Sequence, residues 1–282
     1  MSQHVIHQYL LHDIWMSIIL PYLEYSEAHP LASFTKSQRL RLIQSTIEYR
    51  LEKLLGVERW KTFHTALVKG GGAIAGSWPY QVVVGHEFKD SKDIDVFQPV
   101  EEKEVKNYRS KHRGALPSTY VSHLEEELYN HKSDFTFTEE YNTRVTTYNC
   151  HELGDQLVNV RSYWINNESV VNMLLQQREG EPLPRRARNP DTKTIQVIQV
   201  KNPGGIHDWI HAKFDFDICK ISYCPSDVNE PVRIPHDFDR VMNRQCKFNY
   251  TTNLSTSVGR YNRYKQRGIV FDPIDGNAIL SK

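Results

Sequence analysis

Two pairs of aspartates stand at a spacing that suits the binding of a cation. Asp93 and Asp95 are two residues apart in one apolar run, and Asp215 and Asp217 are two apart in another. Because side chains alternate between the faces of a strand, each pair is expected to point to one side of its strand. Carboxylates crowded on one face repel each other unless a cation lies between them. Mg2+ is commonly held in this way, by one or two carboxylates together with substrate phosphates.

A glycine–serine turn precedes the first pair. Gly76 and Ser77 follow the short apolar run 73–75 and come shortly before Asp93. Glycine admits backbone conformations that let a turn close on a phosphate, and backbone N–H groups at the start of a following helix can receive one. The turn and the carboxylates together predict metal-dependent nucleotide chemistry.

Composition narrows the class of protein. The 282-residue chain has a formal net charge of +1, so no global field draws it to nucleic acid or to a membrane. No apolar run approaches the roughly 18 residues of a membrane span, and the start of the chain lacks the regions of a secretory signal. Its four cysteines do not amount to a disulfide framework. We therefore expect an intracellular protein, cytoplasmic or nuclear, that is neither secreted nor bound to a membrane.

A helical region is predicted at the N-terminal end, over residues 10–60. Apolar residues recur there at three- and four-residue steps, which gives a helix one apolar face. Thr35 and Gln38 have the form of a capping box, which opens a helix. Gly56 is expected to end that helix.

The remaining elements follow from shorter apolar or amphipathic runs. They are a helix over 78–84 ended by Gly85, a strand over 92–97 ended by Pro99, strands over 135–137, 144–148 and 194–200, helices over 168–177 and 204–211, a second acidic strand over 214–223, a basic helix over 256–266 ended by Gly268, and a closing strand over 269–271. We expect an α+β fold in which a small mixed sheet carries the carboxylates. We expect a helical N-terminal cap over 1–60, a core over 61–230, and a C-terminal loop, basic helix and strand over 231–282.

The motifs resemble the signature of the nucleotidyltransferase superfamily, which includes DNA polymerase beta and the poly(A) polymerases. That signature is an apolar residue, a Gly-Gly or Gly-Ser pair, a spacer and an Asp-apolar-Asp triplet, as in Gly76 and Ser77 followed by Asp93 and Asp95. A third carboxylate lies on a later strand of the family, and residues 214–216 match it. The run 260–268 resembles the ending of a subgroup found in large DNA viruses and lower eukaryotes.

The resemblance implies a catalytic site and its ligands. Asp93, Asp95 and Asp215 would hold two Mg2+ ions, or Mn2+ in their place, with Asp215 favoured over Asp217 because it lies in the matched segment. Gly76 and Ser77 would contact the phosphates of an NTP. Lys265 and Arg267 are further candidates for neutralising phosphate charge. The implied reaction transfers a nucleoside monophosphate to a hydroxyl of RNA, of a protein or of a small molecule.

Other interpretations of the sequence stay open. The fold could be catalytically silent and serve for binding or scaffolding. The helices over residues 12–42 resemble an F-box, which would make the chain an adaptor. His207 and His211 are four residues apart on an expected helix and could form a metal pair, although packing or surface histidines are the commoner case. The near-neutral charge argues against a processive nucleic-acid polymerase.

Overall fold

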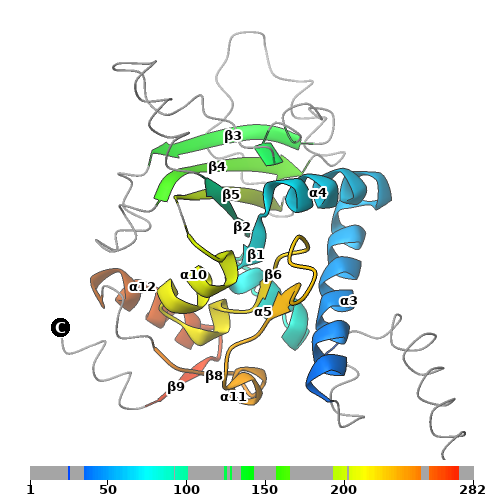
Figure 1. The fold of residues 1–282 in the computed structure, drawn as a ribbon. Coiled ribbons are helices and arrows are strands. Elements are labelled where there is room, and N and C mark those ends of the chain that lie inside the picture. Colours follow the sequence, from blue (N-terminus) through cyan, green and yellow to red (C-terminus); the bar gives the residue numbers. More distant parts are fainter. Residues whose placement is uncertain are drawn as a thin grey trace, which may run out of the picture.

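Figure 1 shows a computed structural model of the chain, and its coloured part is the part described below. The structure describes residues 35–91, 93–100, 135–142, 157–165, 193–201, 203–248 and 254–272, together with Tyr25, Leu124, Glu125 and Leu128. The expected strand over 144–148, the expected helix over 168–177 and most of the F-box-like region lie outside these residues.

A seven-stranded sheet forms the centre of the described chain, in the order β3-β4-β5-β2-β1-β6-β7. The strands are β1 (Ala73–Ala75), β2 (Asp93–Val100), β3 (Phe135–Asn142), β4 (Leu157–Ile165), β5 (Thr194–Lys201), β6 (Ser222–Tyr223) and β7 (Val232–Arg233). The pairing of β2 with β5 is parallel and the other pairings are antiparallel, so the sheet is mixed. The predicted α+β class with a mixed sheet is confirmed, but the sheet is larger than expected.

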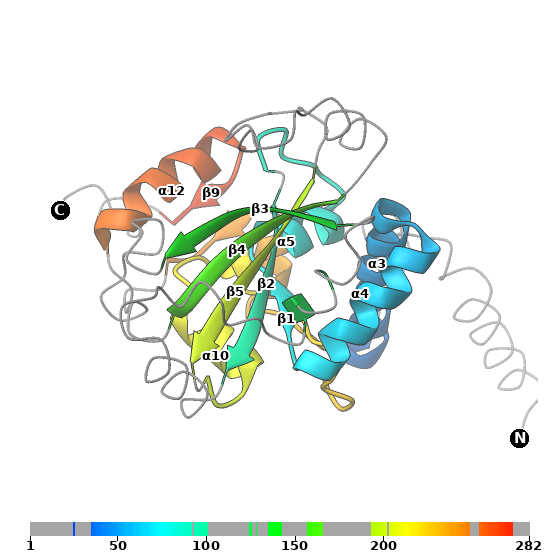
Figure 2. The same ribbon diagram turned by 90° about the horizontal axis from the view of Figure 1, so that it is seen from above.

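Two helices lie at one side of the sheet: α3 (Lys36–Leu55) and α4 (Val57–Gly70). The capping box at Thr35 and Gln38 is present, and Gly56, at φ 81°, ends α3 as predicted. The helix α4 continues across the expected domain boundary at residues 60 and 61. Figures 1 and 2 show α3 and α4 on the opposite side of the molecule from α12 (Leu254–Gln266).

The helix α3 belongs to the main core. It buries Leu42, Ile43, Thr46, Ile47, Leu51 and Leu55. All of these except Thr46 are apolar, and the apolar ones join one cluster with residues of β1, β2, β5 and α12. Two polar contacts fix α3 to distant parts of the chain, since Tyr223 donates to Glu48 at 2.8 Å and Arg39 bonds to Asp239 at 3.0 Å.

Strand β2 runs through Pro99, contrary to the prediction that this proline ends it. Strand β1 pairs with β2 only from Ala73, opposite Phe97, to Ala75, opposite Asp95. At Pro99 the only described neighbour of β2 is therefore β5, where Val200 is its register partner. Proline is tolerated where its strand is not paired on the side that its missing N–H would face.

The predicted strand over 214–223 is wrong. The segment instead forms an isolated bridge between Phe216 and Phe248, a short 3-10 helix over Asp217–Cys219, and then β6. The N–H of Asp217 donates to the carbonyl of Lys247, a residue far along the chain that the local pattern does not reveal. As a result Asp215 and Asp217 do not share a strand face.

The other predicted elements are close to those observed. Helix α5 (Ser77–Val84) ends at Gly85 with φ 68°. Helix α10 (Ile206–Lys213) follows β5, and α12 is followed by Gly268 with φ 81°. The C-terminal part also contains α11 (Phe238–Met242), β8 (Gln245–Cys246) and β9 (Val270–Phe271), and β8 pairs with β9 in a separate small sheet.

Candidate active site at the start of strand β2

Asp93 and Asp95 lie at the beginning of β2, on one face of the sheet. Alternation along the strand puts Phe97 on that face as well, where its ring lies 5.9 Å from Trp209 and 5.1 Å from Phe214. Helix α10 therefore covers this face beside Phe97. Asp93 is exposed and Asp95 is partly buried, while Ile94 between them is fully buried. The shared orientation of the two carboxylates follows the sequence prediction.

The surroundings of this pair disfavour negative charge. Burial, and then the charge of Asp93, raise the pKa of Asp95 to about 7, against the opposing effect of the Arg260 guanidinium. Although Asp93 keeps part of its surface in water, desolvation by the protein around its carboxyl raises its pKa, while the ammonium of Lys193 acts in the opposite direction. A cation bound between two such carboxylates would relieve both the repulsion and part of the cost of burial.

The Gly76–Ser77 turn lies directly against Asp95. Gly76 has φ 91°, and a Cβ built on it would lie 2.7 Å from Oδ2 of Asp95, so only glycine fits both the conformation and the space. Its N–H donates to the carbonyl of Cys219 at 3.0 Å, so this N–H is already engaged and is not aimed at a phosphate. The Ser77 hydroxyl lies 3.0 Å from that of Ser91, in the loop before β2.

Asp215 is bound by helix α12. It is 5% exposed. Its Oδ1 accepts from Arg260 at 2.7 Å and its Oδ2 accepts from the Ser257 hydroxyl at 3.1 Å. Arg260 also lies over the ring of Phe216, 5.4 Å from its centroid. Both oxygens of the third expected ligand are thus occupied by protein donors.

The structure brings together Asp93 and Asp95 but does not add Asp215 to them as a metal ligand. Within the described ranges, no three His, Cys, Asp or Glu side chains are grouped so as to hold a metal ion. Two carboxylates on one face still fit the mode in which Mg2+ takes its other ligands from substrate phosphates and water. The two-ion site with three protein carboxylates is not assembled.

Asp217 is separated from this group. It begins the 3-10 helix, and its carboxylate pairs with Lys220 at 3.1 Å. By contrast, Arg260 bonds to Asp215 and its charge also acts on Asp95. Of the two aspartates in the second acidic segment, Asp215 is therefore the one connected to the first pair.

The two expected basic residues have other contacts. Lys265 is exposed, and its ammonium lies 5.9 Å from the centroid of the Tyr261 ring. Arg267 donates to both oxygens of Asp90, at 3.0 and 2.8 Å, and lies 4.5 Å from the centroid of the Phe88 ring. Arg267 thus fastens the loop before β2 to the end of α12, and the structure shows it in that role instead of at the carboxylates.

The sequence predicts a basic helix over this segment but singles out neither Arg260 nor Ser257. These residues are three apart on a helix and so share a face, which Tyr264 extends by one more turn. The Tyr264 hydroxyl lies 3.1 Å from the sulfur of Cys219. The face that contacts Asp215 could have been recognised from this spacing, but its partner could not.

Of the two histidines of α10, His207 is buried and His211 is half-buried, and the protein disfavours the charged form of both rings. His207 is 3% exposed, and its Nδ1 lies 2.6 Å from the Ser222 hydroxyl. Burial lowers the pKa of His207, and burial together with the charge of Arg233 lowers the pKa of His211 to about 4. The described residues around them supply no third metal ligand, so the structure shows packing histidines at this position.

Comparison with known proteins gives a limited result. No family profile matches the chain. No curated protein sequence matches it. Among solved structures, it is similar to the apo form of a CCA-adding enzyme, with a TM-score of 0.40 and 9% sequence identity, over 82% of this chain and 44% of that one. The chain thus spans less than half the length of the enzyme it matches. In the part of the chain that the structure describes, no helix is long and apolar enough to cross a membrane.

Proposed function

We propose that this chain is a nucleotidyltransferase that moves a nucleoside monophosphate from an NTP to a hydroxyl acceptor. The observation that carries the proposal is the position of Asp93 and Asp95, which share one face of β2 directly opposite the Gly76–Ser77 turn. The raised pKa of Asp95 supports it, because a bound cation would stabilise the ionised form that burial disfavours.

The residues have distinct parts in this proposal. Asp93 and Asp95 would hold Mg2+ or Mn2+, which when bound neutralises and orients the triphosphate. Gly76 keeps the turn close to Asp95 because it has no side chain to displace the carboxylate. The Ser77 hydroxyl, now against Ser91, is placed to donate to a phosphate oxygen. Positioning and charge neutralisation are the main demands of phosphoryl transfer.

In this proposal Asp215 acts by positioning Arg260. The Asp215 carboxylate and the Ser257 hydroxyl fix the position of α12, and Asp215 holds the Arg260 guanidinium where its charge reaches Asp95. Arg260 would then supply positive charge for the triphosphate, the task that the sequence assigned to Lys265 and Arg267. For Asp215 to bind a metal ion itself, its contacts with Arg260 and Ser257 would have to be exchanged.

The test is transfer of label from each of the four NTPs, labelled at the α-phosphate, in the presence of Mg2+ and a pool of RNA, protein and small-molecule acceptors. We expect label in one acceptor class with the wild type, and a loss of at least about a hundredfold in Asp93→Asn and Asp95→Asn. Asp208→Asn is the matched control, because it makes the same chemical change at a carboxylate that is 78% exposed on α10. Transfer at equal rates by Asp93→Asn and wild type would contradict the proposal.

A second function is favoured by one observation. Both oxygens of Asp215 are engaged by Arg260 and Ser257, as in a fold that binds nucleotides or a partner without transferring anything. This alternative predicts that no acceptor becomes labelled although the wild type binds Mg-NTP. Equally poor binding of Mg-NTP by the wild type and by Asp93→Asn would count against both functions.

A further inference from the structure

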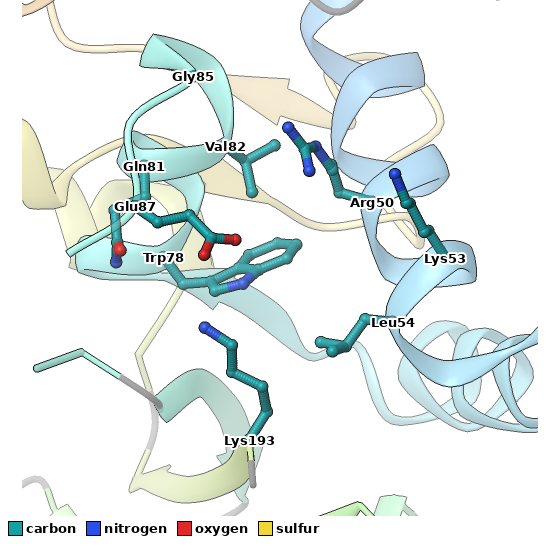
Figure 3. Close-up of a pocket in the computed structure, with 9 residues that line it drawn as sticks. All are labelled: Arg50, Lys53, Leu54, Trp78, Gln81, Val82, Gly85, Glu87 and Lys193. Carbon is teal, nitrogen blue, oxygen red and sulfur yellow. The ribbon is translucent and has the colours of Figure 1, made fainter. Parts of the chain in front are cut away.

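A cavity lies between helices α3 and α5. Its volume is about 290 Å3, close to the lower end of the roughly 300–1,000 Å3 range of small-ligand pockets. Figure 3 shows its lining, which comes from α3, from α5 with the loop that follows it, and from the residue before β5: Arg50, Lys53, Leu54, Trp78, Gln81, Val82, Gly85, Glu87 and Lys193.

The lining combines an apolar floor with a basic rim. Leu54, Trp78 and Val82 supply the apolar surface, and the indole of Trp78 lies in the middle of the group in Figure 3. The lining contains three cationic side chains, those of Arg50, Lys53 and Lys193, and one carboxylate, that of Glu87. The charge of the lining is therefore about +3 − 1 = +2 at neutral pH. A cavity of this kind fits an anion that also has a planar or apolar body.

Two of these cations have no carboxylate partner in the described part of the chain. The ammonium of Lys53 lies 6.0 Å from the centroid of the Tyr49 ring, on its own helix. Lys193 acts on Asp93 through space, but it forms no salt bridge with a described residue. In Figure 3 the Lys193 ammonium points toward the indole of Trp78. Lys53 is exposed at the rim of the cavity. Ammonium groups at the edge of an apolar surface are suited to receive phosphate oxygens.

The cavity and the carboxylates lie on opposite faces of the sheet. Asp93 and Asp95 share their face with Phe97 and α10, whereas the intervening Ile94 joins the core cluster that includes α3, Trp78 and Val82. Thr194 is the register partner of Asp93, so Lys193, one residue earlier, is directed to the face of the cavity. Lys193 is the one lining residue whose charge acts on the carboxylate pair.

We propose that this cavity is a second nucleotide-binding site, in which Lys53 and Lys193 receive the phosphates and Trp78 contacts the base. The proposal rests on the proposed function only in its choice of a nucleotide among phosphate-bearing ligands. It places the ligand on the other face of β2 from the triphosphate that Asp93 and Asp95 would bind. The two sites are connected through Gln81, which donates to the Ser91 hydroxyl that contacts Ser77. Either the donor NTP or the nucleotide end of an acceptor could supply the shared chemistry of base and phosphate.

The experiment removes the first site before testing the second. In the full chain carrying Asp93→Asn and Asp95→Asn, with EDTA present, calorimetry would measure the binding of ATP, of GTP, of a single-stranded trinucleotide with a 5′-phosphate, and of inorganic tripolyphosphate. We expect at least one nucleotide to bind about tenfold or more tightly than tripolyphosphate. Tighter binding of the triphosphates would identify the donor as the source, and tighter binding of the trinucleotide would identify the acceptor.

Point variants in the same background locate the binding. Lys53→Gln and Lys193→Gln should each weaken it by about tenfold, since each removes a charged hydrogen bond. Lys36→Gln, at an exposed position on the first turn of α3, should leave it unchanged. Trp78→Phe keeps most of the packing and should abolish any ligand-induced change in tryptophan fluorescence.

Three results would overturn this inference: no binding of any nucleotide, equal affinity for tripolyphosphate, or unchanged affinity in both lysine variants. None of these results decides whether the chain transfers nucleotides, because that reaction is measured with Mg2+ and the intact carboxylates. Conversely, nucleotide binding in the double variant would support the second site even if no acceptor is ever labelled.

Discussion

Gly76 shows how closely the turn and the carboxylate are fitted together. Replacing it with alanine would force a left-handed φ of 91° on a residue with a side chain and put its Cβ 2.7 Å from Oδ2 of Asp95. We expect Gly76→Ala to lower the free energy of unfolding by about 1–3 kcal/mol and to reduce nucleotide transfer strongly. Chemical denaturation and the labelling assay would measure the two effects. Gly259→Ala is the control, because Gly259 lies in α12 with nothing within 4 Å of its added Cβ, and it should be neutral or slightly stabilising.

The positive charge of Arg260 compensates the negative charge of the buried Asp215 carboxylate. In Arg260→Gln this carboxylate, 6% exposed, keeps the Ser257 hydroxyl but loses its charged partner. We expect a loss of about 2–4 kcal/mol in the free energy of unfolding, measured in urea. The double variant Arg260→Gln with Asp215→Asn should regain part of it, since no uncompensated charge remains. An equal loss in Arg263→Gln, at an exposed position of the same helix, would show that the effect comes from α12 in general.

For individual residues, the sequence predicted positions correctly where they depend on local contacts. Alternation along a short strand was enough to place Asp93 and Asp95 on one face. The partner of Asp215 was not predictable, because Arg260 is 45 residues further along the chain and its contact depends on how α12 packs. Arg267, expected near the phosphates, is held instead by Asp90, which is 177 residues away in the sequence.

The packing of helix α10 makes the stability of the protein depend on pH. His211 has a folded-state pKa of about 4, below the 6.5 of an unperturbed histidine, owing to burial and to the charges of Arg233 and Lys220, which outweigh that of Glu230. Because the unfolded chain binds the proton more readily, the stability that the neutral ring contributes is present above pH 6.5 and is lost as the pH falls toward 4.

The wild type and His211→Gln should therefore differ in how their free energy of unfolding depends on pH. Between pH 7 and pH 4.5, protonation of the partly exposed His211 ring should make the wild type lose about 2 kcal/mol more of its unfolding free energy than His211→Gln. Urea denaturation at several pH values would measure it. His86→Gln, at an exposed position, should follow the wild type. Parallel curves for the wild type and His211→Gln would refute the assignment.

Elements with their own end signals were predicted well. The capping box at Thr35 and the glycines Gly56, Gly85 and Gly268 fix helix ends through interactions within a few residues. The segment over 214–223 was misread because its apolar alternation is typical of a strand. Its backbone groups bond to Lys247 and Gly76 in separate parts of the chain, and these contacts break the strand into a bridge and a 3-10 helix.

In the molecule as a whole, α3 packs into the main core. Five of its buried side chains are apolar, and each contributes roughly 1.5–3 kcal/mol on burial. Their sum is comparable with the total stability of a domain, which is about 5–15 kcal/mol. We therefore expect a fragment of residues 61–282 to lack cooperative unfolding by circular dichroism, whereas the full chain with Leu51→Ala should fold with a loss of about 2–5 kcal/mol. A cooperatively folded 61–282 fragment would show that residues 1–60 form a separate unit.

The attachment of α12 has a consequence for the order in which the protein matures. Arg260 and Arg267 reach back to Asp215 and Asp90, and Tyr223 reaches back to Glu48. Contacts between residues so far apart in sequence form late, because a long loop must close before they yield any stabilisation. During synthesis, Asp215 has neither Arg260 nor Ser257 until the ribosome has released α12. Nascent chains that stall before residue 254 would expose these unpaired groups, so we expect chaperones to bind such chains.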